Sequence, residues 1–274
     1  MTKTVIHSQV VNWLSLLAKE QAIHFDKVIF FVPIFDLLLS KIRKEYTQIA
    51  LDNNLQIAKI PVLRSKWNLW IDRWLAYIFI YKCLKKAKTK KLLIQTRDQK
   101  NIKLIKKIKK KYSIKLIYEH RGVGAEEYIN NLGFESISDV IDPKVKKEYY
   151  NLKRSYQNIF ENSDAIINVS EKMIDYVKTN FTSINDRKLY IMPGAADSTL
   201  FYYDKELRLN SRSEIGLSQK ACALLYSGKL LQPWHMADFI FSLVQRYLLM
   251  IADGYFICLT PDLDYASKLV LEKH

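Results

Sequence analysis

The chain has 274 residues, of which 49% are apolar, so it is long enough for one large or two modest domains with a real core. Its three cysteines are scattered and form neither a Cys-X-X-Cys pair nor a cluster with histidine, which excludes a disulfide framework and indicates no metal site. The formal net charge of +15 indicates an anionic partner.

Short β-type runs alternate with helical stretches along most of the chain, an order typical of βαβ units and a mostly parallel sheet. We predict strands over residues 27–32, 56–61, 91–96, 115–119, 164–169 and 188–192. We predict helices over residues 34–48, 67–87, 98–112, 142–162 and 171–180. The acidic pair Glu126-Glu127 is interpreted as a helix start rather than as two catalytic carboxylates.

A second series of elements follows residue 220. It comprises predicted strands over residues 221–226 and 255–259 and predicted helices over residues 237–251 and 262–273. The polar stretch 201–218, with an Asn-Ser-Arg-Ser turn signal at 210–213, separates the two series. We therefore expect an N-terminal Rossmann-like domain over residues 1–200 and an incomplete second Rossmann-like domain over residues 201–274.

No targeting or membrane-spanning segment is expected. The first residues lack the basic start and small-residue cleavage site of a signal peptide. The longest apolar run, residues 74–81, falls well short of the ~20 residues that a transmembrane helix needs. The sequence therefore predicts a cytoplasmic protein.

The positive charge is concentrated between Lys82 and Arg121. That segment holds sixteen lysines and arginines against two acids, so it carries +14 while the rest of the chain is close to neutral. Isoleucines at helical spacing lie among the lysines of residues 100–111, and Trp67, Trp70 and Trp74 precede them. A basic face beside aromatic residues suits the surface of an anionic membrane. A solvated lysine-rich surface is the simpler alternative, and the tryptophan stripe is interpreted as core.

Three segments in the second half of the chain carry a resemblance to a known family. They are Asn162-Ser-Asp-Ala-Ile-Ile-Asn-Val-Ser170, the series Pro193-X-X-X-Asp197-X-X-X-Phe201, and Leu224-Leu-Tyr-Ser-Gly-Lys-Leu230. In this order and spacing they resemble the central signature of the family 4 glycosyltransferases. The resemblance implies the two-domain GT-B fold, with an acceptor-side domain followed by a domain that binds a nucleotide sugar.

The donor-side residues follow from the third segment. A strand that ends in Ser227-Gly228-Lys229 places a glycine at the carboxyl edge of a parallel sheet, where open α/β folds bind ligands. A lysine beside it supplies a point charge for a diphosphate, and the resemblance assigns that role to Lys229. Trp234 and His235 lie roughly where the family usually has a second lysine followed by glycine, and His235 is a further candidate for the donor site, with a plain loop histidine as the alternative.

The acceptor-side residues come from the end of the strand predicted over 115–119. Glu119, His120 and Arg121, followed by Gly122, resemble the family's charged element that faces the donor sugar. Histidine is the side chain whose pKa best suits a general base near neutral pH. The alternative is a salt-bridged strand end. The resemblance implies retention of anomeric configuration without a protein nucleophile, and we expect no metal or other cofactor.

Two departures from the family pattern shape the functional prediction. The family's glycine after Gly194 is Ala195 here, and its later acidic Glu-X7-Glu motif is missing from the 274 residues. We therefore expect a truncated donor domain, with little activity and weak nucleotide-sugar binding by this chain alone.

The leading prediction is a glycosyltransferase that moves a sugar from a nucleotide sugar to a lipid-linked or polysaccharide acceptor in cell-surface glycan assembly. It would act at the inner face of the cytoplasmic membrane, with a partner chain as one way to complete the donor domain. The alternatives are a non-catalytic subunit and a nucleic-acid-binding protein that uses the lysines. No nucleic-acid motif accompanies those lysines, so no nucleic-acid partner is expected.

Overall fold

The computed structural model describes residues 29–33, 56–60, 77–78, 80–82, 84–85, 91–194, 198 and 202–273. The chain divides into two compact units, residues 1–117 with 162–164, and residues 118–161 with 165–274. The helix predicted over 34–48, the tryptophan stripe, Ala195, Asp197 and Phe201 lie outside the described residues. The domain boundary near residue 200 stays a prediction.

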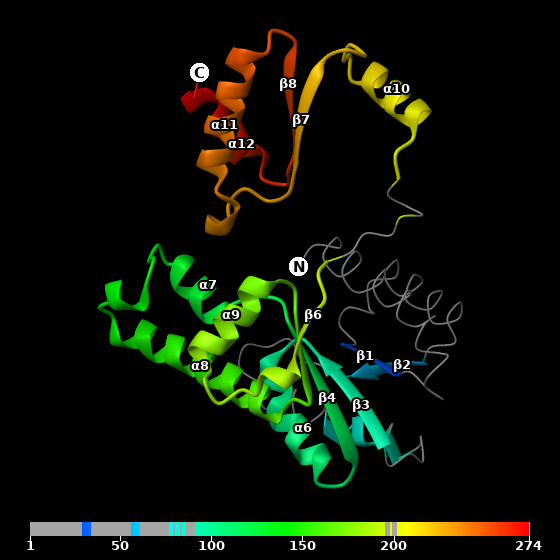
Figure 1. Ribbon diagram of the computed structural model, residues 1–274, viewed down its shortest axis with the longest axis vertical. Coiled ribbons are helices and arrows are strands. Elements are labelled where there is room, and N and C mark those ends of the chain that lie inside the picture. Colours follow the sequence, from blue (N-terminus) through cyan, green and yellow to red (C-terminus); the bar gives the residue numbers. More distant parts are fainter. Residues whose placement is uncertain are drawn as a thin grey trace. The chain divides into compact units, whose positions relative to one another are not determined.

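Two short strands come first, β1 (Ile29–Pro33) and β2 (Gln56–Ile60), and they pair in parallel. A second sheet has the strand order β3-β4-β5-β6 (Figure 1). Its strands are β3 (Lys91–Thr96), β4 (Ser113–His120), β5 (Ala165–Asn168) and β6 (Leu189–Ile191). β5 and β6 are parallel, with Asn168 opposite Ile191.

The basic segment folds around a buried apolar stripe. Helix α6 (Ile102–Lys109) follows the short 3-10 helix η2 (Gln99–Asn101) and connects β3 to β4. Ile102, Ile105 and Ile108 recur every third residue, so they share one helix face, and all three are buried. Ile108 packs with Leu84 and Ile114 of strand β4. The isoleucines are therefore core, and the lysines between them point elsewhere.

Three helices accompany strands β4, β5 and β6. They are α7 (Gly124–Asn130), α8 (Pro143–Asn162) and α9 (Glu171–Asn180), with the 3-10 helices η3 (Ile137–Asp139) and η4 (Asp186–Lys188). Glu126 and Glu127 lie in the first turn of α7, as predicted. α8 starts with a proline, which suits the first helical position, and Ser170 caps α9 by accepting a hydrogen bond from the Met173 amide.

The last part of the chain forms a two-stranded parallel sheet with helices on one face (Figure 1). Its elements are α10 (Lys205–Glu214), β7 (Cys222–Ser227), the 3-10 helix η5 (Pro233–His235), α11 (Ala237–Met250), β8 (Gly254–Leu259) and α12 (Leu263–Lys273). Phe256 and Cys258 of β8 pack against Phe241 and Leu269 of the helices. On the opposite face Leu225 is 63% exposed.

The turn predicted at residues 210–213 is wrong, because α10 runs through it. Asp204 caps this helix by accepting a hydrogen bond from the Leu207 amide. Arg212 donates to the carbonyl oxygens of Ser218 and Ala221. Serine and asparagine favour turns only weakly, so a good cap and a side-chain anchor at the far end are enough to keep the segment helical.

Candidate functional site

The predicted acceptor-side triplet lies at the carboxyl end of strand β4. Glu119 is 2% exposed and His120 is fully buried, whereas Arg121 carries a partly exposed side chain. The Arg121 Nε lies 3.0 Å from a carboxylate oxygen of Glu119. A buried carboxylate needs such a partner, because an unpaired buried charge costs several kcal/mol, about 3–5 when one partner is removed. The structure therefore pairs two of the predicted residues and leaves His120 with a separate environment.

His120 is enclosed by aromatic rings and one amide. Its ring centroid lies 5.1 Å from that of Phe160, 5.6 Å from that of Tyr156 and 6.3 Å from that of Tyr176. Its Nδ1 atom lies 2.9 Å from the Oδ1 atom of Asn168. Its Nε2 atom is buried and has no hydrogen-bond partner among the described residues. An unsatisfied buried polar atom costs about 1–3 kcal/mol, so this one points to a function or to an unseen ligand.

Burial lowers the pKa of His120 below its usual value of 6.5, because a charged ring is poorly solvated inside the protein. The hydrogen bond with Asn168, a backbone hydrogen bond with Gly122 and the charge of Glu126 oppose this effect without reversing it. His120 is therefore neutral at neutral pH. A neutral imidazole can accept a proton or a hydrogen bond, which is what a general base requires.

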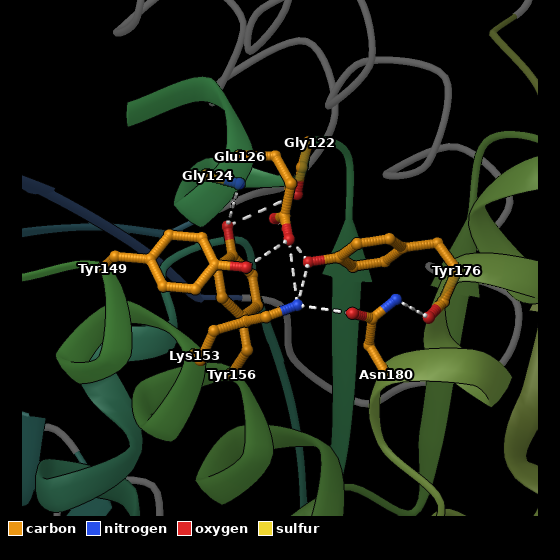
Figure 2. Close-up of polar contacts among 8 residues, drawn as sticks. All are labelled: Gly122, Gly124, Glu126, Tyr149, Lys153, Tyr156, Tyr176 and Asn180. Atoms are coloured by element: carbon orange, nitrogen blue, oxygen red, sulfur yellow. Dashed lines mark hydrogen bonds and ion pairs between the residues drawn. The ribbon is translucent and has the colours of Figure 1, made fainter. Parts of the chain in front are cut away.

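Two clamps hold the loop that follows the triplet. The Tyr156 hydroxyl accepts a hydrogen bond from the Gly124 amide at 3.1 Å and donates to the Gly122 carbonyl at 3.3 Å (Figure 2). The Glu127 carboxylate accepts a hydrogen bond from the Val123 amide at 3.0 Å. A Cβ atom on Gly122 would lie 2.6 Å from that carboxylate, and one on Gly124 would lie 2.8 Å from the tyrosine hydroxyl. A side chain at either position would therefore force the Glu127 carboxylate or the Tyr156 hydroxyl to move.

A polar network joins α7, α8 and α9 (Figure 2), and the ring of its member Tyr176 lies 6.3 Å from that of His120. We call it the Glu126 network; it consists of Glu126, Tyr149, Lys153, Tyr176 and Asn180. Glu126 accepts hydrogen bonds from Tyr149 at 3.1 Å, from Lys153 at 2.9 Å and from Tyr176. Lys153 also donates to the Tyr176 hydroxyl at 2.9 Å and to the Asn180 side chain at 2.7 Å. Each helix contributes to this network, so it braces the three helices.

The network also holds its tyrosines in the neutral form. Burial, and then the negative charge of Glu126, raise the pKa of Tyr149 to about 12. The same two causes, with the hydrogen bond to Glu126, raise the pKa of Tyr176. Both hydroxyls therefore keep their protons and donate hydrogen bonds to the carboxylate. Sequence reasoning missed this network, because its members come from positions that are far apart in the chain and none forms a recognisable motif.

The predicted donor-side residues lie around the carboxyl end of β7. Ser227 is the last residue of the strand, the Gly228 amide donates to the Leu259 carbonyl at 2.9 Å, and the Lys229 side chain is exposed. His235 follows in η5 and is partly buried. The structure thus places all four residues on one strand end and the loop that follows it.

Asp262 is a residue of this loop region that sequence reasoning missed. One oxygen of its carboxylate accepts hydrogen bonds from the Leu230 amide at 2.7 Å and the Leu231 amide at 3.3 Å. The amides that directly follow Lys229 therefore already hold an anionic group of the protein itself. The position of Asp262 in the sequence could have identified it, because it follows strand β8, which pairs with β7 in parallel. Carboxyl ends of parallel strands meet at one edge of a sheet.

Most of the described lysines in the basic segment are exposed to solvent. Lys103, Lys106 and Lys107 are exposed on α6, and Lys110 is exposed directly after it. The Nζ atom of Lys111 lies 4.7 Å from the ring centroid of Tyr81. Lys109 and Lys115 both approach the Asp164 carboxylate, at 3.8 Å and 2.9 Å. One carboxylate thus balances two lysines, and the helix surface stays strongly positive.

Among the described residues, no helix is both long enough and apolar enough to cross a membrane. In the same residues, no three side chains of histidine, cysteine, aspartate or glutamate gather in a way that could hold a metal ion.

Three solved structures share the fold of this chain. A glycosyltransferase from Rickettsia africae matches with a TM-score of 0.53 and 10% identity over 91% of this chain and 64% of that one. HepE from Anabaena, in complex with UDP-glucose, matches with a TM-score of 0.52 and 12% identity over 94% and 60%. Sucrose-phosphate synthase from Thermosynechococcus elongatus matches with a TM-score of 0.50 and 15% identity over 73% and 46%.

This chain therefore spans less than two-thirds of the length of each of these proteins. No protein-family model and no curated protein sequence matches it. The predicted α/β architecture with parallel strands is confirmed, and the structures that share it are of the glycosyltransferase type. Membership of family 4 in particular stays a prediction.

Proposed function

We propose that this chain is part of a glycosyltransferase that transfers a sugar from a nucleotide-sugar donor to a lipid-linked or polysaccharide acceptor in cell-surface glycan assembly. The observation that carries the proposal is strand β7, which ends at Ser227 and is followed by Gly228 and Lys229, within an α/β fold shared with three proteins of this type. One of those structures holds UDP-glucose, which makes a nucleoside diphosphate sugar the first donor to test.

Lys229 is the residue that we propose to bind the diphosphate of the donor. Its side chain is exposed, whereas the amides of Gly228, Leu230 and Leu231 already donate to other groups. A diphosphate at this loop would therefore depend on side-chain charge more than on backbone amides. Ammonium groups bind phosphate as compact point charges, which suits an exposed lysine. Ser227 and His235 would add hydrogen bonds from either side of the loop.

On the acceptor side we give His120 the role of base or hydroxyl partner. It is neutral at neutral pH, and Glu119 and Arg121 next to it are paired with each other. That pairing fixes the strand end, so Arg121 would help to orient the reacting groups rather than exchange protons. The family resemblance implies no protein nucleophile, and none is assigned.

The test of the donor site is titration of the labelled chain with UDP-glucose while backbone amide resonances are recorded. We expect shifts centred on residues 227–235, and weaker binding by Lys229→Ala than by the control Lys220→Ala, an exposed lysine before β7. Equal binding by the two variants would remove Lys229 from the site. Shifts centred elsewhere, or none at millimolar nucleotide sugar, would contradict the proposed donor site.

We further propose that the basic segment from Lys82 to Arg121 attaches the protein to the inner face of the cytoplasmic membrane. The apolar stripe of α6 is buried while its lysines are exposed, so attachment would be electrostatic. Each interfacial lysine contributes ~1 kcal/mol at an anionic surface. The dissociation constant for vesicles rich in phosphatidylserine should therefore rise by a factor of at least about ten in the variant Lys103→Gln/Lys110→Gln.

The matched control is Lys144→Gln/Lys172→Gln, which removes two exposed lysines outside the basic segment and should bind as the unmodified chain does. Raising the salt concentration should weaken the binding, because exposed charges are screened. Equal affinity for neutral and anionic vesicles would contradict the proposal. Salt-sensitive binding to duplex DNA without vesicle binding would favour the nucleic-acid alternative.

A second candidate function is that of a non-catalytic subunit which binds another polypeptide of a glycosyltransferase. The observation that favours it is the open face of the β7–β8 sheet, where Leu225 and Leu259 are 63% and 57% exposed. Apolar patches of this kind mark interaction surfaces. Leu225→Lys should leave the fold of the chain intact. If it does not reduce co-purification with a donor-domain polypeptide, the face is not the interface.

A further inference from the structure

The side-chain amide of Asn168 has only one orientation that satisfies its surroundings. Asn168 is fully buried at the end of β5. Its Nδ2 atom faces two backbone carbonyls, that of Ile166 at 3.4 Å and that of Tyr190 at 3.5 Å. Carbonyl oxygens can only accept hydrogen bonds, so the NH2 group must lie on their side. The reversed amide would set three oxygen atoms against one another, and Oδ1 must therefore face His120.

This orientation determines which nitrogen of His120 carries the proton. The Asn168 Oδ1 atom can only accept, and it lies 2.9 Å from the His120 Nδ1 atom. Nδ1 must therefore be the donor. A neutral imidazole has a single N–H, so Nε2 then carries a lone pair and no hydrogen.

The hydroxyl and carboxylate groups around His120 are engaged with other partners. The Tyr156 hydroxyl on α8 is engaged with Gly122 and Gly124, and the Tyr176 hydroxyl on α9 is engaged with Glu126 and Lys153. On the histidine's own strand, Glu119 is paired with Arg121. Among the described residues Nε2 has no hydrogen-bond partner, although the Gly122 backbone also acts on the ring and raises its pKa.

We propose that Asn168 is a positioning residue that holds His120 as the Nδ1–H tautomer, so that Nε2 can accept a hydrogen bond but cannot donate one. The group opposite Nε2 must then bring its own hydrogen, as a hydroxyl does. A carboxylate or phosphodiester oxygen has no hydrogen to offer and is disfavoured there. The tautomer stands on the geometry alone, whereas the assignment of the hydroxyl to a sugar rests on the proposed function.

The test is long-range proton–nitrogen correlation NMR on the chain labelled at histidine, with the His120 signals identified by their loss in His120→Gln. We expect a proton on Nδ1 and none on Nε2. Asn168→Leu removes the acceptor and should give a mixture of tautomers with a clear Nε2–H population. The control Asn151→Leu, at an exposed position on α8, should leave the His120 signals unchanged.

Asn168→Asp keeps an acceptor in the same place and adds a negative charge. It should preserve the Nδ1–H tautomer and raise the pKa of His120, since Glu126 on α7 already acts in that direction. If Asn168→Leu does not fold, the unmodified chain and Asn168→Asp still decide the matter. A proton on Nε2 in the unmodified chain overturns the proposal, and so does an unchanged tautomer in a folded Asn168→Leu protein.

Ligand titration separates this proposal from the proposed function. Methyl glucoside offers hydroxyls, and inorganic sulfate, which is fully ionised at neutral pH, offers only acceptors. A shift of the His120 Nε2 signal with the glycoside and none with sulfate supports a hydroxyl partner. A shift with sulfate alone overturns the assignment of a hydroxyl. If neither ligand shifts the signal, the sugar-binding role of His120 fails, while the tautomer result stands or falls on the Asn168 variants.

Discussion

Replacing Lys153 by methionine should destabilise the protein more than the loss of any surface lysine. The Lys153 Nζ atom lies 2.9 Å from Glu126, 2.9 Å from the Tyr176 hydroxyl and 2.7 Å from Asn180. The two side chains of the ion pair are only 18% and 27% exposed. Methionine fills a similar volume but makes none of these bonds, and it leaves the Glu126 carboxylate without its cation.

The magnitude follows from the partial burial of that carboxylate. Breaking a fully buried pair costs about 3–5 kcal/mol, and an exposed pair is worth about 0–1 kcal/mol. Glu126 keeps two tyrosine donors after the change, so we expect Lys153→Met to lower the free energy of unfolding by about 2–3 kcal/mol. Urea titration followed by circular dichroism measures this as a lower midpoint with an unchanged slope.

The matched control is Lys172→Met. Lys172 lies on α9, its side chain is 95% exposed, and it approaches Asp175 only at 3.9 Å. Its loss should change the free energy of unfolding by less than about 0.5 kcal/mol. If the two variants differ by less than about 0.5 kcal/mol, the Glu126 network does not brace the three helices. If the double variant Lys153→Met/Glu126→Gln is as stable as the unmodified chain, then the loss in Lys153→Met comes only from the unpaired charge of Glu126.

Three further predictions address other parts of the chain. The pKa of Tyr149 is about 12 in the folded protein and near 10 in the unfolded chain, so its contribution to stability is complete below pH 10 and is lost as the pH rises toward 12. Between these pH values the urea midpoint should therefore fall less steeply for Tyr149→Phe than for the unmodified chain, and parallel curves would show that Tyr149 does not cause the pH dependence. Gly124→Ala should lower the free energy of unfolding, measured by urea titration, by about 1–2 kcal/mol, because the added Cβ meets the Tyr156 hydroxyl at 2.8 Å. The control Gly194→Ala places its Cβ where nothing lies within 4 Å, and an equal loss of stability in the two variants would mean that the loop at Gly124 adjusts without cost. Asp262→Asn should speed hydrogen exchange at the amides after Lys229 more than the exposed-site control Asp264→Asn does, and unchanged protection would show that the carboxylate does not hold that loop.

Local periodicity determined most of the elements. The spacing of Ile102, Ile105 and Ile108 predicted a helix with one buried face, and all three are buried. The predicted helix over 142–162 corresponds closely to α8, Pro143–Asn162, because its apolar residues repeat at helical intervals. Strand β4 extends the predicted 115–119 by two residues at its start and one at its end. Polar stretches were harder, as α10 shows, because their local preferences are weak and a cap decides the outcome.

The sequence by itself determined that His120, Glu119 and Arg121 stand at a strand end and that Ser227, Gly228 and Lys229 stand at another, since each set is contiguous. Only the tertiary structure decided what surrounds them. Asn168 reaches His120 from a strand 48 residues further along the chain. Asp262 reaches the loop after β7 from the end of β8, and Glu126 on α7 gathers its partners from two other helices. Long-range contacts of this kind depend on the order of strands and the packing of helices, and neither of these is encoded in any short stretch of sequence.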